Sequence, residues 1–426
     1  MLYTELTKKA MKIAYEAHKD QVDKSGLPYI YHPIHLAEQM ESEDEICVAL
    51  LHDVAEDTDI TLEQLKEMGF NENIIYAIRL MTHDDNMPYM EYVKRIKGCS
   101  DLAKKVKLVD LSHNSDLSRL DYVSEKDIKR VEKYSQAQLL LGLKNSRIYG
   151  AVIGDIVGSK YEFNNIKTKD FPFLSEGCNY TDDTIMTIAV AKALLRIKYS
   201  DFSDFDTFLV EEMQRLGRLY PNPQGGYGGN FEQWIWNNNP KPYNSFGNGS
   251  AMRVSPCAIY AVELEEALKL AEISASVTHN HPEGIKGAKA VAAAIFMAKT
   301  GKTKDEIREY ISEEFYPLTE TLDEIRATYT FNETCQGTVP QAIIAFLESA
   351  DLEDAIRNAV SLGGDCDTLT AITGSIAWAY YSKCDEYGNF EIPLDLTLLN
   401  EINSILPSNF VGIMLEFEKR SIARQG

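Results

Sequence analysis

Two short segments of the chain place aspartates and threonines directly before a long run of small and apolar residues. Residues 180–195 read YTDDTIMTIAVAKALL, and residues 361–381 read SLGGDCDTLTAITGSIAWAYY. The apolar runs are too continuous for exposed helices, so we predict helices that are buried in a large core. Acidic groups at the start of a buried helix need a partner, because an unpaired buried charge is costly.

Two kinds of partner fit this pattern. Aspartate and threonine can accept hydrogen bonds from the free N–H groups at a helix start, and for one segment alone such capping is the commoner role. Alternatively, carboxylate and hydroxyl oxygens are the ligands that a hard cation prefers. The second copy favours the cation, because two such clusters could face each other across one cleft. One or two Mg2+ ions would then be held by Thr181, Asp182, Asp183, Asp365, Asp367 and Thr368.

The first part of the chain has a different site chemistry, since six of the eight histidines precede residue 120. The candidate residues are His32, the adjacent pair His52 and Asp53, and the distant Asp110. Two imidazoles and two carboxylates suit a borderline divalent ion such as Mn2+. The alternative is four ordinary polar residues at helix ends, but the ordered series of histidines and aspartates is more specific than a lone His-Asp dipeptide.

Helical spacing would bring further polar side chains to the same place. We predict one helix over residues 45–57, on which Glu56 and Asp57 follow His52 and Asp53 by four residues each, so that all four project toward one side. In the segment KVKLVDLSHN, the same spacing places Asn114 on the face of Asp110. Residues 1–145 contain no convincing strand, so we predict an all-helical domain, followed by a second domain over residues 146–426.

The second domain begins with a glycine stripe and contains several small-residue loops. Gly150, Gly154 and Gly158 recur every four residues and would let another helix approach the backbone closely. Glu162 follows, and a solvated surface glutamate is the simplest reading of it. Tyr227 lies among four glycines and could stack on a base or belong to a plain surface turn. We predict a loop for GNGSAMRVSP, with backbone N–H groups that could bind phosphates. In VTHNHPEG, His279 could be a ligand or a hydrogen-bond donor, or it could be ordinary polar surface.

Composition limits the partners and the compartment. The 426 residues favour at least two domains, and the net charge of −22 leaves no basic surplus for nucleic-acid phosphates. No apolar run reaches membrane-spanning length, and residues 1–20 are amphipathic without a signal-peptide core. The seven cysteines show no CxxC spacing and are typical of reduced thiols. We therefore expect a cytoplasmic protein with neither a nucleic-acid nor a membrane partner.

Three motifs of the first domain, AHKDQVDKSGLPYIYHP, LLHDVAEDT and VKLVDLSHN, resemble the HD hydrolase domain of RelA/SpoT proteins and their small hydrolase-only relatives. The resemblance implies a helical bundle in which the two histidines and two aspartates above bind a metal and Glu56 and Asp57 position the attacking water. It implies removal of the 3′-pyrophosphate from guanosine tetra- or pentaphosphate, or from a related nucleotide, near Lys24 and Asn114. The family usually has two basic residues before Ser25, where this chain has Asp23 and Lys24.

Five motifs of the second domain, GDIVGSKYE, YTDDT, GNGSAMR, THNHPEG and SLGGDCDTLT, look like the ADP-ribosylglycohydrolase family, which includes dinitrogenase-reductase-activating glycohydrolase. The resemblance implies an all-α domain with two Mg2+ ions on the six side chains named above. It implies that Glu162 acts as an acid/base residue and that His279 lies near the distal ribose. The diphosphate and ribose would be held by Gly247, Asn248, Gly249, Ser250 and Met252.

Together these observations predict an all-α hydrolase that removes ADP-ribose from a protein or a small molecule, with a second hydrolase domain for a guanine or related nucleotide. An alternative for the first domain is a non-catalytic nucleotide sensor that regulates the glycohydrolase. Asp23 stands where the family usually has a basic residue that contacts the nucleotide. This difference leaves the sensor alternative open.

Overall fold

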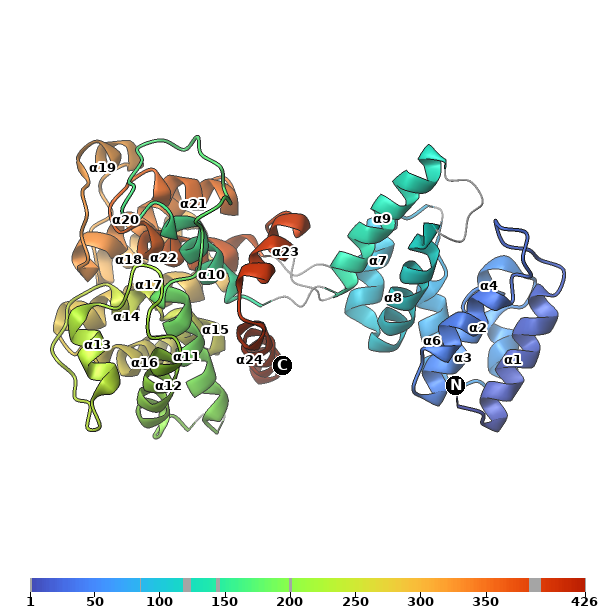
Figure 1. Ribbon diagram of the computed structural model, residues 1–426. Coiled ribbons are helices and arrows are strands. Elements are labelled where there is room, and N and C mark those ends of the chain that lie inside the picture. The colour runs from blue at the N-terminus through green and yellow to red at the C-terminus, as the bar shows by residue number, and fades with distance from the viewer. Residues whose placement is uncertain are drawn as a thin grey trace. The chain divides into compact units, whose positions relative to one another are not determined.

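The computed structural model describes residues 2–84, 86–117, 124–142, 146–198, 201–382 and 392–425. These residues fall into two compact units, one on each side of the predicted domain boundary (Figure 1). Regular structure in the described ranges is helical, with isolated β-bridges and no sheet, which confirms the predicted all-α class. The boundary predicted between residues 145 and 146 adjoins residues 143–145, which lie outside the described residues.

The first unit is a bundle of mostly short helices, several of which begin at a side-chain cap. At the start of α5, the side chains of Thr61 and Gln64 form a capping box. The helices are α1 Glu5–His18, α2 Tyr31–Glu38, α3 Glu43–Leu51, α4 Val54–Asp57, α5 Leu62–Glu67, α6 Glu72–Met81, α7 Tyr89–Cys99, α8 Asp101–Ser115 and α9 Glu125–Gly142.

The single helix predicted over residues 45–57 is wrong, because α3 ends at Leu51 and α4 begins at Val54. Asp53 lies between them, at the N-cap position of α4. Its carboxylate accepts a hydrogen bond from the Tyr29 hydroxyl at 2.7 Å. The regular pattern of the sequence is therefore interrupted at the His52-Asp53 pair, where a polar contact from another segment holds the side chain.

The second unit contains the remaining fifteen helices of the described residues. They are α10 Tyr149–Ser159, α11 Asp182–Arg196, α12 Phe205–Leu219, α13 Gly229–Trp236, α14 Gly249–Met252, α15 Ser255–Tyr260, α16 Leu264–Ser276, α17 Pro282–Lys299, α18 Lys304–Glu314, α19 Leu322–Thr328, α20 Cys335–Leu347, α21 Leu352–Val360, α22 Cys366–Tyr381, α23 Leu396–Ile405 and α24 Ser408–Gln425. None of the helices in the described ranges is long and apolar enough to cross a membrane.

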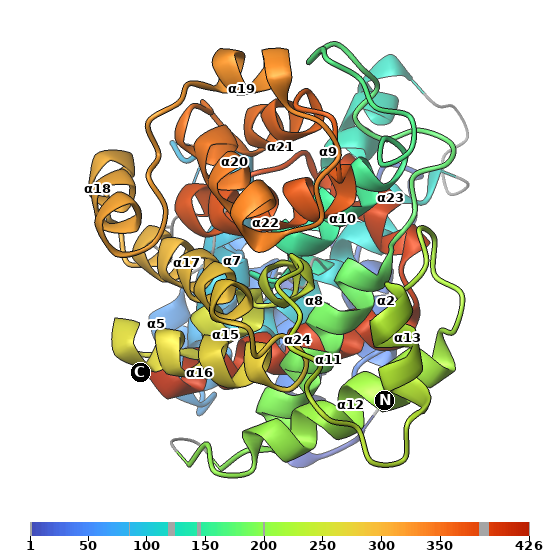
Figure 2. The ribbon, with the colours of Figure 1, turned by 90° about the vertical axis from the view of Figure 1, so that its left-hand side faces the viewer.

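The two helices α10 and α22 cross at the centre of this unit (Figure 2). Every residue of α10 is buried, and so are residues 366–379 of α22, as their apolar sequences predict. The glycine stripe of α10 makes the crossing possible. A Cβ at Gly154 would collide with the backbone carbonyl of Thr370, and one at Gly150 would collide with that of Gly374. The crossing brings the end of α10 next to the beginning of α22.

The sequence predicts a helix over about residues 339–349, but α20 begins earlier. The helix begins at Cys335, after Thr334, whose side chain accepts a hydrogen bond from the backbone N–H of Gly337. Pro340 therefore lies inside the helix rather than in its first turn. The earlier start extends the helix back to the segment 331–334, which contributes to the cavity described below.

Candidate active sites in the two units

The start of α11 is fixed by a buried aspartate that sequence reasoning did not single out. Asp155 on α10 accepts hydrogen bonds from the Thr181 hydroxyl at 2.7 Å and from the backbone N–H groups of Thr181 and Thr184 at 2.9 and 3.1 Å. The Thr181 hydroxyl in turn accepts from the backbone N–H of Asp183 at 3.1 Å and so caps the helix. In the sequence analysis, Asp155 appears only as the second residue of the motif GDIVGSKYE.

The start of α22 is organised differently, and the capping role considered for Asp365 is wrong. Asp365 occupies the N-cap position without a side-chain capping hydrogen bond. Its Oδ2 instead accepts a hydrogen bond from the Asn248 side chain at 2.6 Å. The preceding residues Gly363 and Gly364 have positive φ angles of 69° and 82°, and the Asn165 side chain bonds both polar backbone groups of Gly364. These contacts turn the Asp365 carboxylate away from the helix and toward the cavity.

The two predicted clusters meet in one cavity of about 520 Å3. The Thr368 hydroxyl donates to Asp183 Oδ2 at 3.2 Å, and ligand oxygens of Glu162, Asp365 and Asp367 all lie within 4.8 Å of one another. Five of the six predicted ligands line the cavity, namely Asp182, Asp183, Asp365, Asp367 and Thr368. Thr181 lies behind them, fully buried against Asp155.

The chemistry of these oxygens fits a bound cation. Glu162 Oε2, Asp183 Oδ1 and Asp367 Oδ1 are buried without a hydrogen-bond partner. Burial and then the neighbouring Asp367 carboxylate raise the pKa values of Asp182 and Asp183 well above their usual range. Burial likewise raises the pKa of Asp365 to about 6. Carboxylates this close repel one another, and a divalent cation would remove the repulsion.

Glu162 is a cavity residue, so the reading as a solvated glutamate is wrong. It follows the end of α10 by three residues, and its exposed fraction is 9%. Burial, and after it the charge of Asp367, raises the pKa of Glu162 to about 8. Gly225 lies against it with a φ of 78°, and a Cβ there would be 2.8 Å from Glu162 Oε2. A carboxyl group that titrates near neutrality is suited to proton transfer.

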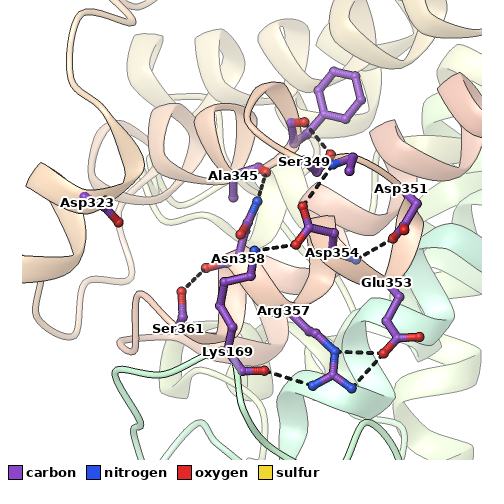
Figure 3. Close-up of polar contacts among 12 residues, drawn as sticks. Lys169, Asp323, Ala345, Ser349, Asp351, Glu353, Asp354, Arg357, Asn358 and Ser361 are labelled. Atoms are coloured by element: carbon purple, nitrogen blue, oxygen red, sulfur yellow. Dashed lines mark hydrogen bonds and ion pairs between the residues drawn. The ribbon is translucent and has the colours of Figure 1, made fainter.

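The segment that follows Glu162 is held by α21 (Figure 3). The Arg357 guanidinium donates to the backbone carbonyls of Lys169 and Phe171 at 2.9 and 2.7 Å. The Lys169 ammonium forms an ion pair with Asp354. Arg357 is itself held by Glu353 at 2.8 Å on the preceding turn of the helix. The loop that follows Glu162 is therefore fixed to α21 at residues 169–171.

Most of the predicted substrate-binding residues line the same cavity. Gly247, Asn248, Gly249, Met252, Tyr227 and His279 are among them. Ser250 does not line it, because its hydroxyl points inward and donates to the Gly284 carbonyl at 2.7 Å. Sequence reasoning missed Phe163, Tyr243, Ser245, Phe331 and Glu333, which also line the cavity, and it included the cavity residue Arg253 only as part of the motif GNGSAMR. They come from segments whose patterns indicated only loops or helix ends.

Two local expectations need correction. Residues 249–252, expected in a loop, form the short helix α14, which follows residues 247 and 248 where they pair with Glu333 and Thr334. His279, for which exposed polar surface was one reading, is 5% exposed, and its Nδ1 lies 2.7 Å from the Thr278 hydroxyl. Burial, and next the buried Arg253, lowers the pKa of His279 well below its usual range. It is therefore a neutral imidazole facing the cavity.

In the first unit, the four predicted ligands converge. His32 Nε2 lies 3.5 Å from Asp53 Oδ2 and 3.3 Å from Asp110 Oδ1. His52 Nε2 lies 3.1 Å from Asp53 Oδ2 and 4.0 Å from Asp110 Oδ1. The two helices α2 and α8 and the α3–α4 junction supply these atoms, so the alternative of unrelated polar residues at helix ends does not describe the arrangement.

This cluster also fits a metal ion. His52 Nδ1 is 2.9 Å from the Ala49 carbonyl, so it carries the proton, and the buried Nε2 presents its lone pair toward the cluster without a hydrogen-bond partner. Burial alone would raise the pKa of Asp110, but the Lys107 ammonium 2.8 Å away holds the pKa well below its usual range. Imidazole nitrogens beside carboxylate oxygens are the donor set of a borderline divalent ion.

The other predicted site residues of this unit are Glu56, Asp57, Asn114 and Lys24. Burial, followed by the charge of Asp53, raises the pKa of Glu56 to about 7 and also raises that of Asp57. The Asn114 side chain donates to Asp110 Oδ1 at 2.6 Å, as the shared helix face predicts. Lys24 is exposed, and its ammonium lies 3.9 Å from Asp127 Oδ1.

Comparison with known proteins identifies the family of the second unit. The family model described as ADP-ribosylglycohydrolase matches residues 146–383. The chain belongs to the ADP-ribosylglycohydrolase family. The human ADP-ribosylhydrolase ARH3 is 28% identical over 313 residues, which cover 54% of this chain and 83% of that protein. The ADP-ribosylarginine hydrolase Tri1 of Pseudomonas putida is 27% identical over 262 residues, which cover 55% of this chain and 69% of that protein.

The first unit has a relative of another kind. The zebrafish guanosine-3′,5′-bis(diphosphate) 3′-pyrophosphohydrolase MESH1 is 34% identical over 151 residues, which cover 32% of this chain and 83% of that protein. The ADP-ribosylglycohydrolase family member is therefore fused to a MESH1-like HD domain, as its motifs indicate. Both parts are related to hydrolases.

Proposed function

We propose that residues 146–426 form a domain that hydrolyses ADP-ribosyl linkages at a centre of two Mg2+ ions. The observation that carries this proposal is the convergence of the Glu162, Asp183 and Asp367 carboxylates, each with a buried unpartnered oxygen, in one cavity. Its volume of about 520 Å3 lies within the range of small-molecule sites. The ligands would be the six predicted side chains, five from the cavity wall and Thr181 behind them.

The cavity residues have different roles in cleaving a bond at the anomeric carbon of ribose. Such a cleavage passes through an oxocarbenium-like state, and bound Mg2+ supplies charge neutralisation and orientation of oxygen ligands. Glu162, with its pKa near neutrality, exchanges a proton with the water or the leaving group. The segment 247–252 and Tyr227 bind the remainder of the ADP-ribose, and His279 contacts it as a neutral imidazole.

We propose a second activity for residues 1–145, the removal of a 3′-pyrophosphate from guanosine tetra- or pentaphosphate or a related nucleotide. The convergence of His32, His52, Asp53 and Asp110 favours it. A bound Mn2+ or similar ion would lower the pKa of water and neutralise phosphate charge. Glu56, with a pKa of about 7, and Asp57 would hold the attacking water. Asn114 and Lys24 would contact the nucleotide.

Paired variants of the full-length chain test both proposals at once. Asp367→Asn should abolish Mg2+-dependent release of ADP-ribose from serine-, arginine- or acetyl-linked substrates and leave guanosine tetraphosphate hydrolysis intact. Asp53→Asn should do the reverse. The glycohydrolase proposal fails if the wild-type chain with Mg2+ releases no ADP-ribose from any of these substrates.

The sensor alternative gives a different result in the same experiment. Guanosine tetraphosphate would then bind without turnover and change the rate of ADP-ribose release. The Asp23 carboxylate accepts hydrogen bonds from the backbone N–H groups of Ser25 and Leu27 at 2.8 and 3.0 Å. This aspartate stabilises its own turn, so its presence does not by itself argue against a catalytic first domain.

A further inference from the structure

The two histidines of the first-unit cluster are oriented by different partners. For His52, Nδ1 lies 2.9 Å from the Ala49 backbone carbonyl. A carbonyl or carboxylate is the usual partner for the second nitrogen of a metal-binding histidine. For His32, the corresponding contact is to another imidazole, because its Nδ1 lies 2.8 Å from Nδ1 of His113.

The positions of the nitrogens decide which of them faces a metal. His32 Nε2 is the atom near Asp53 and Asp110, at 3.5 and 3.3 Å, so it presents the lone pair to the cluster. The proton of a neutral His32 must then be on Nδ1. A 2.8 Å contact between two nitrogens requires one proton between them, so His113 accepts it through the lone pair of its own Nδ1.

The fold holds the His113 ring in place for this contact. His113 is three residues after Asp110 on α8, so one helix delivers both a ligand carboxylate and the group that orients a ligand imidazole. The His35 ring packs against His113 with centroids 4.4 Å apart and planes tilted by 30°. The His113 ring centroid also lies 4.9 Å from that of the His32 ring.

We propose that His113 is a positioning residue for the metal ion of the first unit. It fixes the tautomer and the ring orientation of His32 by accepting its Nδ1 proton, and it does not touch the ion. This inference rests on the proposed metal site, and the experiment below separates the two. Loss of such a partner typically weakens metal binding by about 10- to 100-fold.

The test measures Mn2+ affinity in the full-length chain by counting free Mn2+ in an electron paramagnetic resonance titration. Asp365→Ala and Asp367→Ala are included throughout to remove the carboxylate cluster of the second unit. The matched variants are His113→Asn and His113→Gln, whose side-chain oxygens lie near the positions of Nδ1 and Nε2 respectively. We expect His113→Asn to keep the affinity within about 3-fold, and His113→Gln and His113→Ala to weaken it by about 10- to 100-fold.

Each other result has a defined meaning. Equal affinities for the asparagine and glutamine variants would overturn the positioning role, because a packing role does not distinguish the two acceptor positions. The role is also overturned if His113→Ala binds Mn2+ as tightly as the parent. If the parent shows no Mn2+ site that Asp53→Ala removes, the proposed metal site itself fails. His35→Phe keeps the ring packing and should leave the affinity unchanged, and circular dichroism verifies that each variant is folded.

Discussion

The Thr368 hydroxyl donates a hydrogen bond to Asp183 Oδ2 at 3.2 Å and joins the starts of α22 and α11. The two residues are 185 positions apart in the chain, and each belongs to a cluster of oxygen donors at the start of a buried helix. This hydrogen bond satisfies only one carboxylate oxygen, and Asp367 and Glu162 present further oxygens without a partner. The metal-free second unit therefore contains electrostatic repulsion that its helices must withstand.

The first prediction concerns the removal of one of these charges. Asp367→Asn keeps the shape of the side chain and removes a carboxylate whose pKa burial and then Asp365 raise well above its usual range. The melting temperature of the metal-free second unit should rise by roughly 2–4 °C, which corresponds to about 1 kcal/mol, and Mg2+ should no longer stabilise it. All three tryptophans lie in this unit, so their fluorescence reports its unfolding alone.

A control for that prediction is Asp323→Asn, whose carboxylate is 88% exposed in an ion pair with Arg326. It should change neither the metal-free melting temperature nor the response to Mg2+. A lower melting temperature for Asp367→Asn without metal would contradict the repulsion that we infer.

The second prediction is a pH dependence of the metal-free protein. The folded-state pKa values of Asp155, Asp365 and Glu162 are raised to about 6, 6 and 8, in each case first by burial. The folded state therefore binds protons more tightly than the unfolded state. The stability from this source is complete below pH ~4, the pKa of an unfolded carboxyl group, and is lost as the pH rises to about 8.

Thermal melts in EDTA between pH 5 and pH 8.5, followed by tryptophan fluorescence, measure this loss. Saturating Mg2+ should flatten the profile, because it binds the ionised form. Glu162→Gln should remove the part of the decline between pH 6 and pH 8. Stability that rises with pH in EDTA would show that these carboxyl groups are not the dominant titrating groups.

The third prediction concerns the crossing of α10 and α22. Gly154→Ala would place a methyl group against the backbone carbonyl of Thr370, which cannot move without displacing α22. We expect a loss of about 3 kcal/mol or more, or no folded second unit, as measured by urea unfolding. Gly412→Ala on α24 is the matched control, since nothing lies within 4 Å of a Cβ there, and it should be neutral or stabilise by up to about 1 kcal/mol.

The glycine stripe and the two Asp/Thr clusters illustrate what the sequence could predict. Periodicity at Gly150 and Gly154 implies a close helix approach, and a repeated TDDT-like pattern implies a shared site, because both depend on local spacing. Asp155 was missed for a related reason. Its bonds to Thr181 and Thr184 arise only when α10 and α11 are packed together, and one aspartate in a glycine-rich helix does not indicate such a partner.

Asp365 is a case in which the local sequence pattern favours a role that the folded structure does not show. Local preference favours a cap at this position, but the tertiary contact to Asn248 turns the carboxylate elsewhere. His113 was quoted within a motif, yet nothing in the spacing of the chain pairs it with His32. Such pairings between distant segments need a structure, whereas the choice of candidate ligands does not.

The fourth prediction concerns Lys299, which lies at the end of α17 and bonds the end of α15. Its ammonium donates to the carbonyls of Ala258, Ile259 and Ala261 at 2.7, 2.9 and 2.6 Å. Lys299→Met keeps the length and packing of the stem but leaves these buried acceptors without their donor. We expect the free energy of unfolding to fall by roughly 2–4 kcal/mol in urea titrations followed by tryptophan fluorescence.

Lys289→Met on the same helix is the control for Lys299. Lys289 is 29% exposed and forms an ion pair with Glu272 at 3.2 Å, an interaction that contributes little at a surface. This variant should stay within about 0.5 kcal/mol of the parent. If both variants unfold alike, the three carbonyls are satisfied by water when the ammonium is removed, and Lys299 does not hold the end of α15.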